Sequence, residues 1–178
     1  MRNKLAVAMI GLLLCLAGPA FAGKKSAEDV LDDAGISATI KAGLLDNKNT
    51  HAGKINVESY KGVVQLSGFV GSEAEKEAAG KVAKGVDGVR EVHNSLAIQP
   101  PTSLGTKLDD SLTTGRVKAA LMDSADVKSM QINVETTNGI TQLAGFVTSE
   151  GMKERAEKVA SRVDGVKRVD NVLLVKPK

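Results

Sequence analysis

The sequence predicts an α+β fold made of two tandem α-β-β-α-β domains, each a three-stranded mixed sheet packed on two helices. The chain repeats itself at an interval of 77 residues: residues 31–101 align with 108–178 without a gap, with 33 identical positions among 71. Each copy combines apolar residues at helical spacing with apolar residues at every second position, and a turn dipeptide ending in glycine separates two of the strand patterns. A period of this length is typical of a duplicated domain and exceeds that of common solenoid repeats.

The repeat divides the chain into an N-terminal part and two domains. We expect a signal peptide over 1–22, a short segment over 23–30, the first domain over 31–100, a linker over 101–107 and the second domain over 108–178. A domain of roughly 70 residues buries only about 60% of its chain surface and is marginally stable alone. We therefore expect the two copies to pack against each other.

The first helix of each copy is predicted from apolar residues spaced by four. These are Ile36, Ile40 and Leu44 in the first copy, with Val117 and Leu121 in the second. Acidic and hydroxyl residues before or beside them are typical of a helix start, where they cap free N–H groups and favour the positive end of the helix dipole. The residues assigned to this role are Asp32, Asp33, Asp109, Asp110 and Ser111.

A hairpin follows the first helix in each copy. Ile55 and Val57 alternate with polar residues in its first strand, and the turn is Lys61-Gly62 or Asn138-Gly139. Asn-Gly is a preferred two-residue hairpin loop because both positions tolerate a positive φ. The second strand is predicted over 63–70 and 140–147, and the glycine inside it, Gly68 or Gly145, indicates a bulge or close backbone packing.

The second helix and the last strand complete each copy. Ser72 with Glu75 three residues later forms a predicted capping box, and Gly88 marks the end of the helix. The apolar helix face is Ala79, Val82, Ala83 and Val86, repeated as Ala156, Val159, Ala160 and Val163. The last strand has Val92, Leu96 and Ile98 on one face, matched by Val169, Leu173 and Val175.

The N-terminus predicts export. Arg2 and Lys4 precede an apolar run over 5–17, and Ala20-Phe21-Ala22 is a small-x-small cleavage site. The apolar run is shorter than the roughly 20 residues that span a bilayer, so we predict no transmembrane segment in the mature chain. Cleavage before Cys15 to give a lipoprotein is the less favoured alternative, because Leu14 is not the small residue that such a site requires. The expected location is the periplasm.

Composition and motifs indicate neither an enzyme nor a nucleic-acid-binding protein. A formal net charge of +3 over 178 residues is too small to indicate nucleic-acid binding. His51 and His93 have no partners at metal-ligand spacing and are interpreted as surface histidines. No nucleophile-elbow, P-loop or dinucleotide motif occurs in the sequence, so we predict no catalytic residue, cofactor or metal site. Asn94 and Asn171, in phase with the last strand, are interpreted as fixing a bulge or a helix end, with ligand binding as the alternative.

One feature of the second copy is absent from the first. Arg155, Lys158 and Arg162 are spaced as one face of the predicted second helix, and Lys167 and Arg168 follow. Such a basic stripe is suited to anionic phospholipid, at about 1 kcal/mol for each basic residue near the surface. The alternative is a solvated face of mixed charge, because glutamates are interleaved with these residues.

The ordered set of strand and helix motifs resembles the BON domain, which occurs in tandem in bacterial envelope proteins. The residues that carry the resemblance are Val64, Leu66, Gly68, Val70, Ala83, Val86, Gly88, Val89, Val92, Asn94 and Leu96, with Leu143, Gly145, Val147, Ala160, Val163, Gly165, Val166, Val169, Asn171 and Leu173 in the second copy. The resemblance implies the same fold and a non-enzymatic periplasmic protein of the envelope or osmotic stress response. It also implies peripheral phospholipid binding or, alternatively, chaperone-like shielding of exported or outer-membrane clients.

Overall fold

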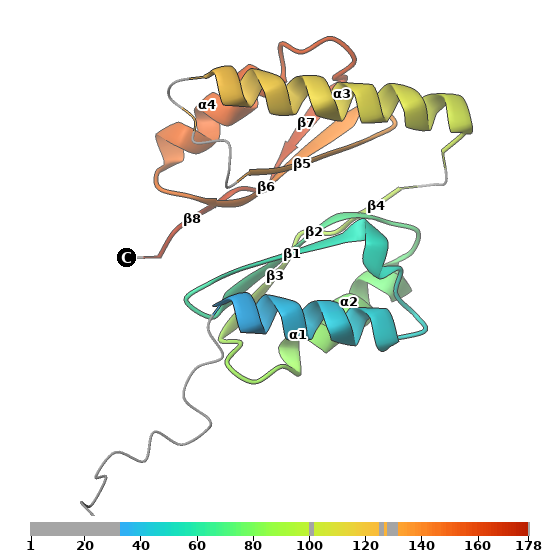
Figure 1. Ribbon diagram of the computed structural model, residues 1–178, viewed down its shortest axis with the longest axis vertical. Coiled ribbons are helices and arrows are strands. Elements are labelled where there is room, and N and C mark those ends of the chain that lie inside the picture. The colour runs from blue at the N-terminus through green and yellow to red at the C-terminus, as the bar shows by residue number, and fades with distance from the viewer. Residues whose placement is uncertain (1–32, 100–101, 125–126, 128–131, 178) are drawn as a thin grey trace, which may run out of the picture.

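The computed structural model describes residues 33–99, 102–124, 127 and 132–177. These residues form four layers, with two sheets back to back in the middle and a pair of helices on each outer side (Figure 1). The predicted signal peptide over 1–22 and the segment over 23–30 lie outside the described residues. The α+β class and the tandem arrangement are confirmed.

Apart from η1, the described elements of the two copies are the same and follow the same order. The first consists of α1 (Asp33–Asp46), a short 3-10 helix η1 (Ala52–Lys54), β1 (Ile55–Tyr60), β2 (Val63–Val70), α2 (Glu73–Lys84), β3 (Glu91–Asn94) and β4 (Ala97–Ile98). The second consists of α3 (Leu104–Asp123), β5 (Ile132–Thr137), β6 (Ile140–Val147), α4 (Glu150–Ala160), β7 (Arg168–Asn171) and β8 (Leu174–Val175). Residues 104–107, assigned to the linker from the sequence, form the first turn of α3.

Each sheet is mixed, and its last strand is interrupted. β1 pairs with β2 antiparallel, while β3 and β4 both pair with β2 in parallel. The second sheet has the same pairing. The interruption has a local cause, because Asn94 Oδ1 accepts a hydrogen bond from Leu96 N and its Nδ2 donates to Lys76 O in α2. Asn171 binds Leu173 N and Lys153 O in the same way, so the structural interpretation of both asparagines is confirmed.

One core lies between each sheet and its helices. Ile36, Ile40 and Leu44 of α1 are buried against Val57 and Leu66 of the sheet. Val117 and Leu121 of α3 occupy the corresponding places in the second copy, together with Val134 and Leu143. The helical spacing of four and the strand spacing of two therefore identified the inward faces correctly.

The expected capping role of the aspartates is wrong in the second copy. α3 begins at Leu104, and its N-cap is Ser103, whose Oγ accepts from Thr106 N at 3.2 Å. Asp110 lies well inside α3 and instead accepts hydrogen bonds from the hairpin N–H groups of Asn138 and Gly139, at 2.8 and 2.9 Å. An aspartate that the sequence pattern places at a helix start can thus lie inside the helix and bind the N–H groups of a turn distant in sequence.

The equivalent aspartate of the first copy, Asp33, holds its hairpin in the same way. Its carboxylate accepts from Lys61 N at 2.7 Å, Gly62 N at 2.9 Å and Ser59 Oγ at 3.0 Å. Burial alone would raise the pKa of Asp33, but the hydrogen bonds from Gly62, Lys61 and Ser59 leave it below its ordinary value. This contact fixes the tight turn, where Lys61 and Gly62 both have positive φ.

Candidate functional site

The helix-free faces of the two sheets are joined by a reciprocal pair of glutamines. Gln65 Oε1 accepts from Gly145 N at 2.7 Å, and Gln142 Oε1 accepts from Gly68 N at 2.6 Å. Their amide groups donate to Val172 O and Ser95 O, at 2.5 and 3.0 Å. Both glutamines are almost fully buried, at 0% and 2% exposure. Buried polar groups need hydrogen-bond partners, and each glutamine finds its partners in the backbone of the other domain.

A second reciprocal pair reinforces the interface. Asn56 Nδ2 donates to Glu135 Oε2 at 3.2 Å, and Asn133 Nδ2 donates to Glu58 Oε1 at 2.7 Å. All these contacts repeat with an offset of 77 residues, so an approximate two-fold axis relates the domains. The packing expected from the small size of each domain is confirmed. The buried glutamines carrying it were missed, although an identical Gln within the second strand of both copies was a signal.

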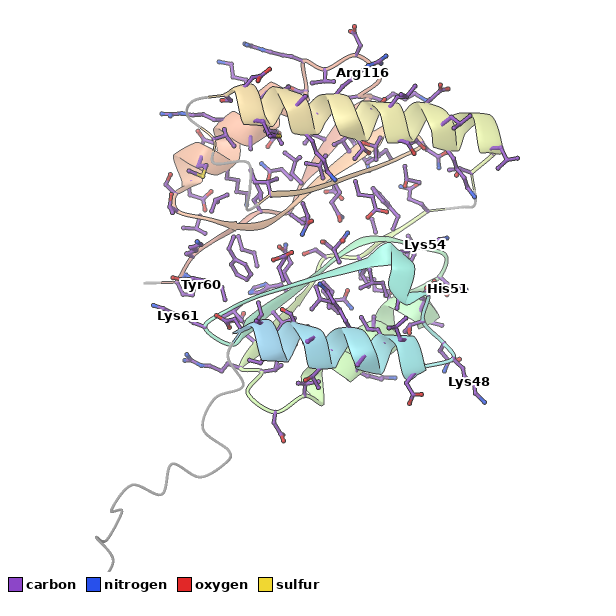
Figure 2. All side chains as sticks on the ribbon, in the orientation of Figure 1. Lys48, His51, Lys54, Tyr60, Lys61 and Arg116 are labelled. Carbon is purple, nitrogen blue, oxygen red and sulfur yellow. The ribbon has the colours of Figure 1, made fainter. Side chains whose placement is uncertain are left out.

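The two ends of this interface differ. At one end the ring of Tyr60 lies 5.7 Å from that of Phe146, and Lys176 Nζ lies 5.0 Å from the Tyr60 ring centroid. At the other end the counterpart of Tyr60 is Thr137, which lines an interdomain cleft of about 510 Å³. Figure 2 shows Tyr60 at one end of the space between the sheets and Lys54, which also lines the cleft, at the opposite end.

The outer face of α3 carries large apolar side chains without cover from the rest of the described chain. Leu104, Leu108 and Leu112 are 81%, 69% and 59% exposed, and Met122 is 70% exposed. A spacing of four advances about 40° around a helix, so the three leucines share one face, and Met122 returns to it after five turns. We call these four residues the α3 stripe. It lies opposite the face that Val117 and Leu121 bury in the core.

Charged residues border the α3 stripe. Lys107 and Lys118 lie along one side of it and Arg116 along the other, all exposed. Arg116 projects from the outer layer in Figure 2. Asp109 and Asp123 offset part of this charge beside Arg116, so the border next to Lys107 and Lys118 is the more basic one. A contiguous exposed apolar stripe with a polar rim marks a surface that binds a protein partner or a membrane.

The five basic residues predicted from the sequence are all exposed but do not form one helical stripe. Arg155 and Lys158 lie on α4, whereas Arg162 lies beyond the end of α4 at Ala160. Lys167 precedes β7 and Arg168 begins it. Lys167 borders a depression that Leu112 and Arg116 of α3 also line, so it connects this group to the α3 stripe.

Both histidines pair with nearby glutamates. His51 Nδ1 lies 2.8 Å from Glu75 Oε1, and His93 Nε2 lies 3.1 Å from Glu91 Oε1. Burial would raise the pKa of Glu75, but hydrogen bonds from Gly71 and His51, with the charge of His51, leave it lowered. The described part of the chain contains no cluster of three potential metal ligands.

The sequence signal for the α3 stripe was present but was not recognised. Leu104, Leu108 and Leu112 repeat at intervals of four, yet the first of them was assigned to the linker. In the first copy the four equivalent positions are Ala27, Leu31, Gly35 and Leu45, so two of them carry a large apolar residue and two do not. Among the described residues, no helix is both long and apolar enough to cross a bilayer.

Comparison with known proteins identifies both copies. The sequence profile of the BON domain matches residues 32–100 and 109–177. The chain is 43% identical over 148 residues to osmotically-inducible protein Y of Escherichia coli K12, covering 82% of this chain and 74% of that protein. It is 38% identical over 120 residues to outer membrane lipoprotein DolP of Haemophilus influenzae, covering 67% and 62%. It is also 32% identical over 120 residues to a 21 kDa hemolysin of Actinobacillus pleuropneumoniae, covering 67% and 61%.

Proposed function

Because this chain belongs to the BON-domain family, and resembles osmotic-stress and envelope proteins, we propose that it is a non-enzymatic periplasmic protein that binds phospholipid surfaces peripherally. Residues 1–22 would direct export and be removed. The names of two relatives, one osmotically inducible and one an outer membrane lipoprotein, support a role at the envelope under osmotic stress. The domains at 31–100 and 108–178 would act as one rigid unit.

The observation that carries this proposal is the α3 stripe. Its three leucines are on average about two-thirds exposed, so burying them in the acyl boundary would contribute about 3–6 kcal/mol. Lys107, Lys118 and Arg116 would each add about 1 kcal/mol near an anionic surface. The apolar contribution is large enough to bind a surface reversibly, and the basic edges favour anionic lipid.

The proposed orientation places α3 against the membrane. α3 and α4 form one outer layer, while α1 and α2 lie on the far side of both sheets (Figure 1). Arg155, Lys158 and Arg162 would contribute to binding only if α4 also approaches the lipid. Lys167 is adjacent to the α3 stripe and would contribute in either case.

Flotation of the chain without residues 1–22 on neutral and anionic liposomes tests the proposal. We expect co-flotation with anionic vesicles that weakens as salt rises. The triple variant Leu104→Ser, Leu108→Ser, Leu112→Ser should bind at least about tenfold less, because it loses most of the apolar contribution. Leu45→Ser is the matched control, since Leu45 is a 76% exposed leucine on α1.

Two other results would change the proposal. Loss of binding in Arg155→Ser, Lys158→Ser, Arg162→Ser with full binding by the leucine variant would move the lipid site to α4. Absence of flotation even at low salt would reject the lipid proposal and favour shielding of exported client proteins, which an aggregation assay without lipid would then test.

A further inference from the structure

We propose that the interdomain cleft beside α3 binds a zwitterionic phosphoethanolamine head group, with Glu135 pairing with its ammonium and two lysines pairing with its phosphate. This inference rests on the proposed membrane function, because it names the lipid head group that would lie next to the α3 stripe. It assigns a role in binding to the first domain as well.

The cleft is built by both domains and by Thr102, which lies between them. Its volume is about 510 Å³, enough for a head group of a few heavy atoms and its water. Lys54, Phe69 and Gln99 line it from the first domain, and Thr102 from the linker. The second domain lines it with Lys107, Asp110, Ser111, Thr114, Glu135, Thr136 and Thr137.

A difference between the two copies helps to keep the cleft open. At the symmetry-related end of the interface, the Tyr60 ring lies against Phe146. Thr137 occupies the equivalent position in the cleft and is much smaller, so space remains between α3 and the first domain. The same difference supplies a steric test, because a tyrosine at position 137 would place a ring in the proposed head-group site.

The charges of the cleft match a ligand that carries both signs. Lys54 and Lys107 are exposed and both line the cleft, one from each domain, so together they supply positive charge for a phosphate. The carboxylate of Asp110 is already bound to the Asn138 and Gly139 N–H groups. Glu135 accepts one hydrogen bond, from Asn56, and is half-buried. It is therefore the carboxylate that can accept an ammonium.

The pKa of Glu135 supports this assignment. Burial raises it above its ordinary value, although the hydrogen bond from Asn56 and the charges of Lys118 and Lys54 partly oppose the shift. A raised pKa means that the negative charge is incompletely compensated, and a bound ammonium would compensate it. The surrounding hydroxyl and amide groups offer further hydrogen bonds to the phosphate and the glycerol.

The cleft is continuous with the α3 stripe. Lys107 and Ser111 line the cleft, while Leu104 and Leu108 each lie three residues before one of them, on the adjacent helix face. A lipid with its head group in the cleft could therefore lay its acyl chains along the α3 stripe. One zwitterionic molecule would engage the charged pocket and the apolar surface together, while the basic edges of the α3 stripe would contact anionic lipids around it.

Soluble head groups test the cleft without a membrane. We would titrate the isotope-labelled chain lacking residues 1–22 with glycerophosphoethanolamine, glycerophosphoglycerol and inorganic phosphate, and follow amide shifts by NMR. Saturable shifts at Gly71, Thr102 and Ser111 are expected with glycerophosphoethanolamine. Glu135→Gln keeps an acceptor for Asn56 but loses the charge, and should weaken binding about tenfold or more.

Two further variants separate the pocket from general electrostatics. Thr137→Tyr should weaken binding by filling the cleft, whereas Lys48→Ser should leave it unchanged, because Lys48 is an exposed lysine outside the cleft (Figure 2). If Thr137→Tyr lowers the thermal midpoint, Glu135→Gln decides the outcome. Binding unaffected by Glu135→Gln, equal binding of all three probes, or no saturable shift would each overturn the inference. Flotation through the α3 stripe is an independent measurement, so the two proposals can fail separately.

Discussion

Replacement of Gln65 by leucine tests whether the buried amides hold the two domains together. The side chain is fully buried, so Gln65→Leu keeps the volume approximately but removes the acceptor for Gly145 N and the donor to Val172 O. Each lost hydrogen bond contributes about 0.5–1.5 kcal/mol, and a buried group left unpaired costs about 1–3 kcal/mol. We therefore expect the free energy of unfolding to fall by about 2–4 kcal/mol.

Urea denaturation followed by circular dichroism measures this loss. The midpoint should fall, and a separate transition for each domain should appear if the interface fails before the cores do. Gln99→Leu is the control, because Gln99 is a half-exposed glutamine that follows β4, and its substitution should change stability by less than about 0.5 kcal/mol. A loss below about 0.5 kcal/mol for Gln65→Leu would refute the reasoning and assign the interface to apolar contacts.

The remaining predictions concern the same interface and the hairpin. Gly68→Ala should destabilise the fold by more than about 2 kcal/mol in the same urea assay, because Gly68 has φ +120° and an added Cβ would clash with the carbonyl oxygen of Lys54. Since the folded pKa of Asp33 is lowered, its contribution is present above the unfolded pKa and is lost as pH falls through the folded pKa. Asp33→Asn should thus flatten the acid limb of the stability–pH profile. The folded pKa of Glu135 is raised, so its contribution to stability is lost as pH rises. The stability of Glu135→Gln relative to wild type should therefore be higher at neutral pH than at acid pH.

The fold could be predicted from the sequence because the apolar residues of each helix or strand recur at the spacing typical of that element. Ile36, Ile40 and Leu44 are one helical face, and the Asn138-Gly139 dipeptide marks the hairpin. Because the sequence repeats, each assignment could be made in both copies and compared. The interruption of the last strand was less accessible, because it depends on the side-chain contacts of Asn94 with a helix distant in sequence.

The candidate site was harder to predict. Charge spacing led to Arg162, which the structure places beyond the end of α4. The spacing of Leu104 and Leu108 was visible in the sequence, but their exposure was not, because a leucine in an amphipathic pattern is normally buried. The cleft beside Thr137 depends on how the two domains pack, and no local pattern encodes that arrangement.

The reciprocal glutamine contacts have a consequence for how the molecule assembles. Each half presents the same surface to the other, which is the geometry of an isologous dimer, here confined within one chain. Because the two halves are connected in one chain, they associate within a molecule and not between molecules. For a short linker the effective concentration of one half near the other is in the millimolar range. Pairing of the halves is consequently independent of protein concentration, and α3 keeps a fixed orientation relative to the first domain even when the protein is dilute.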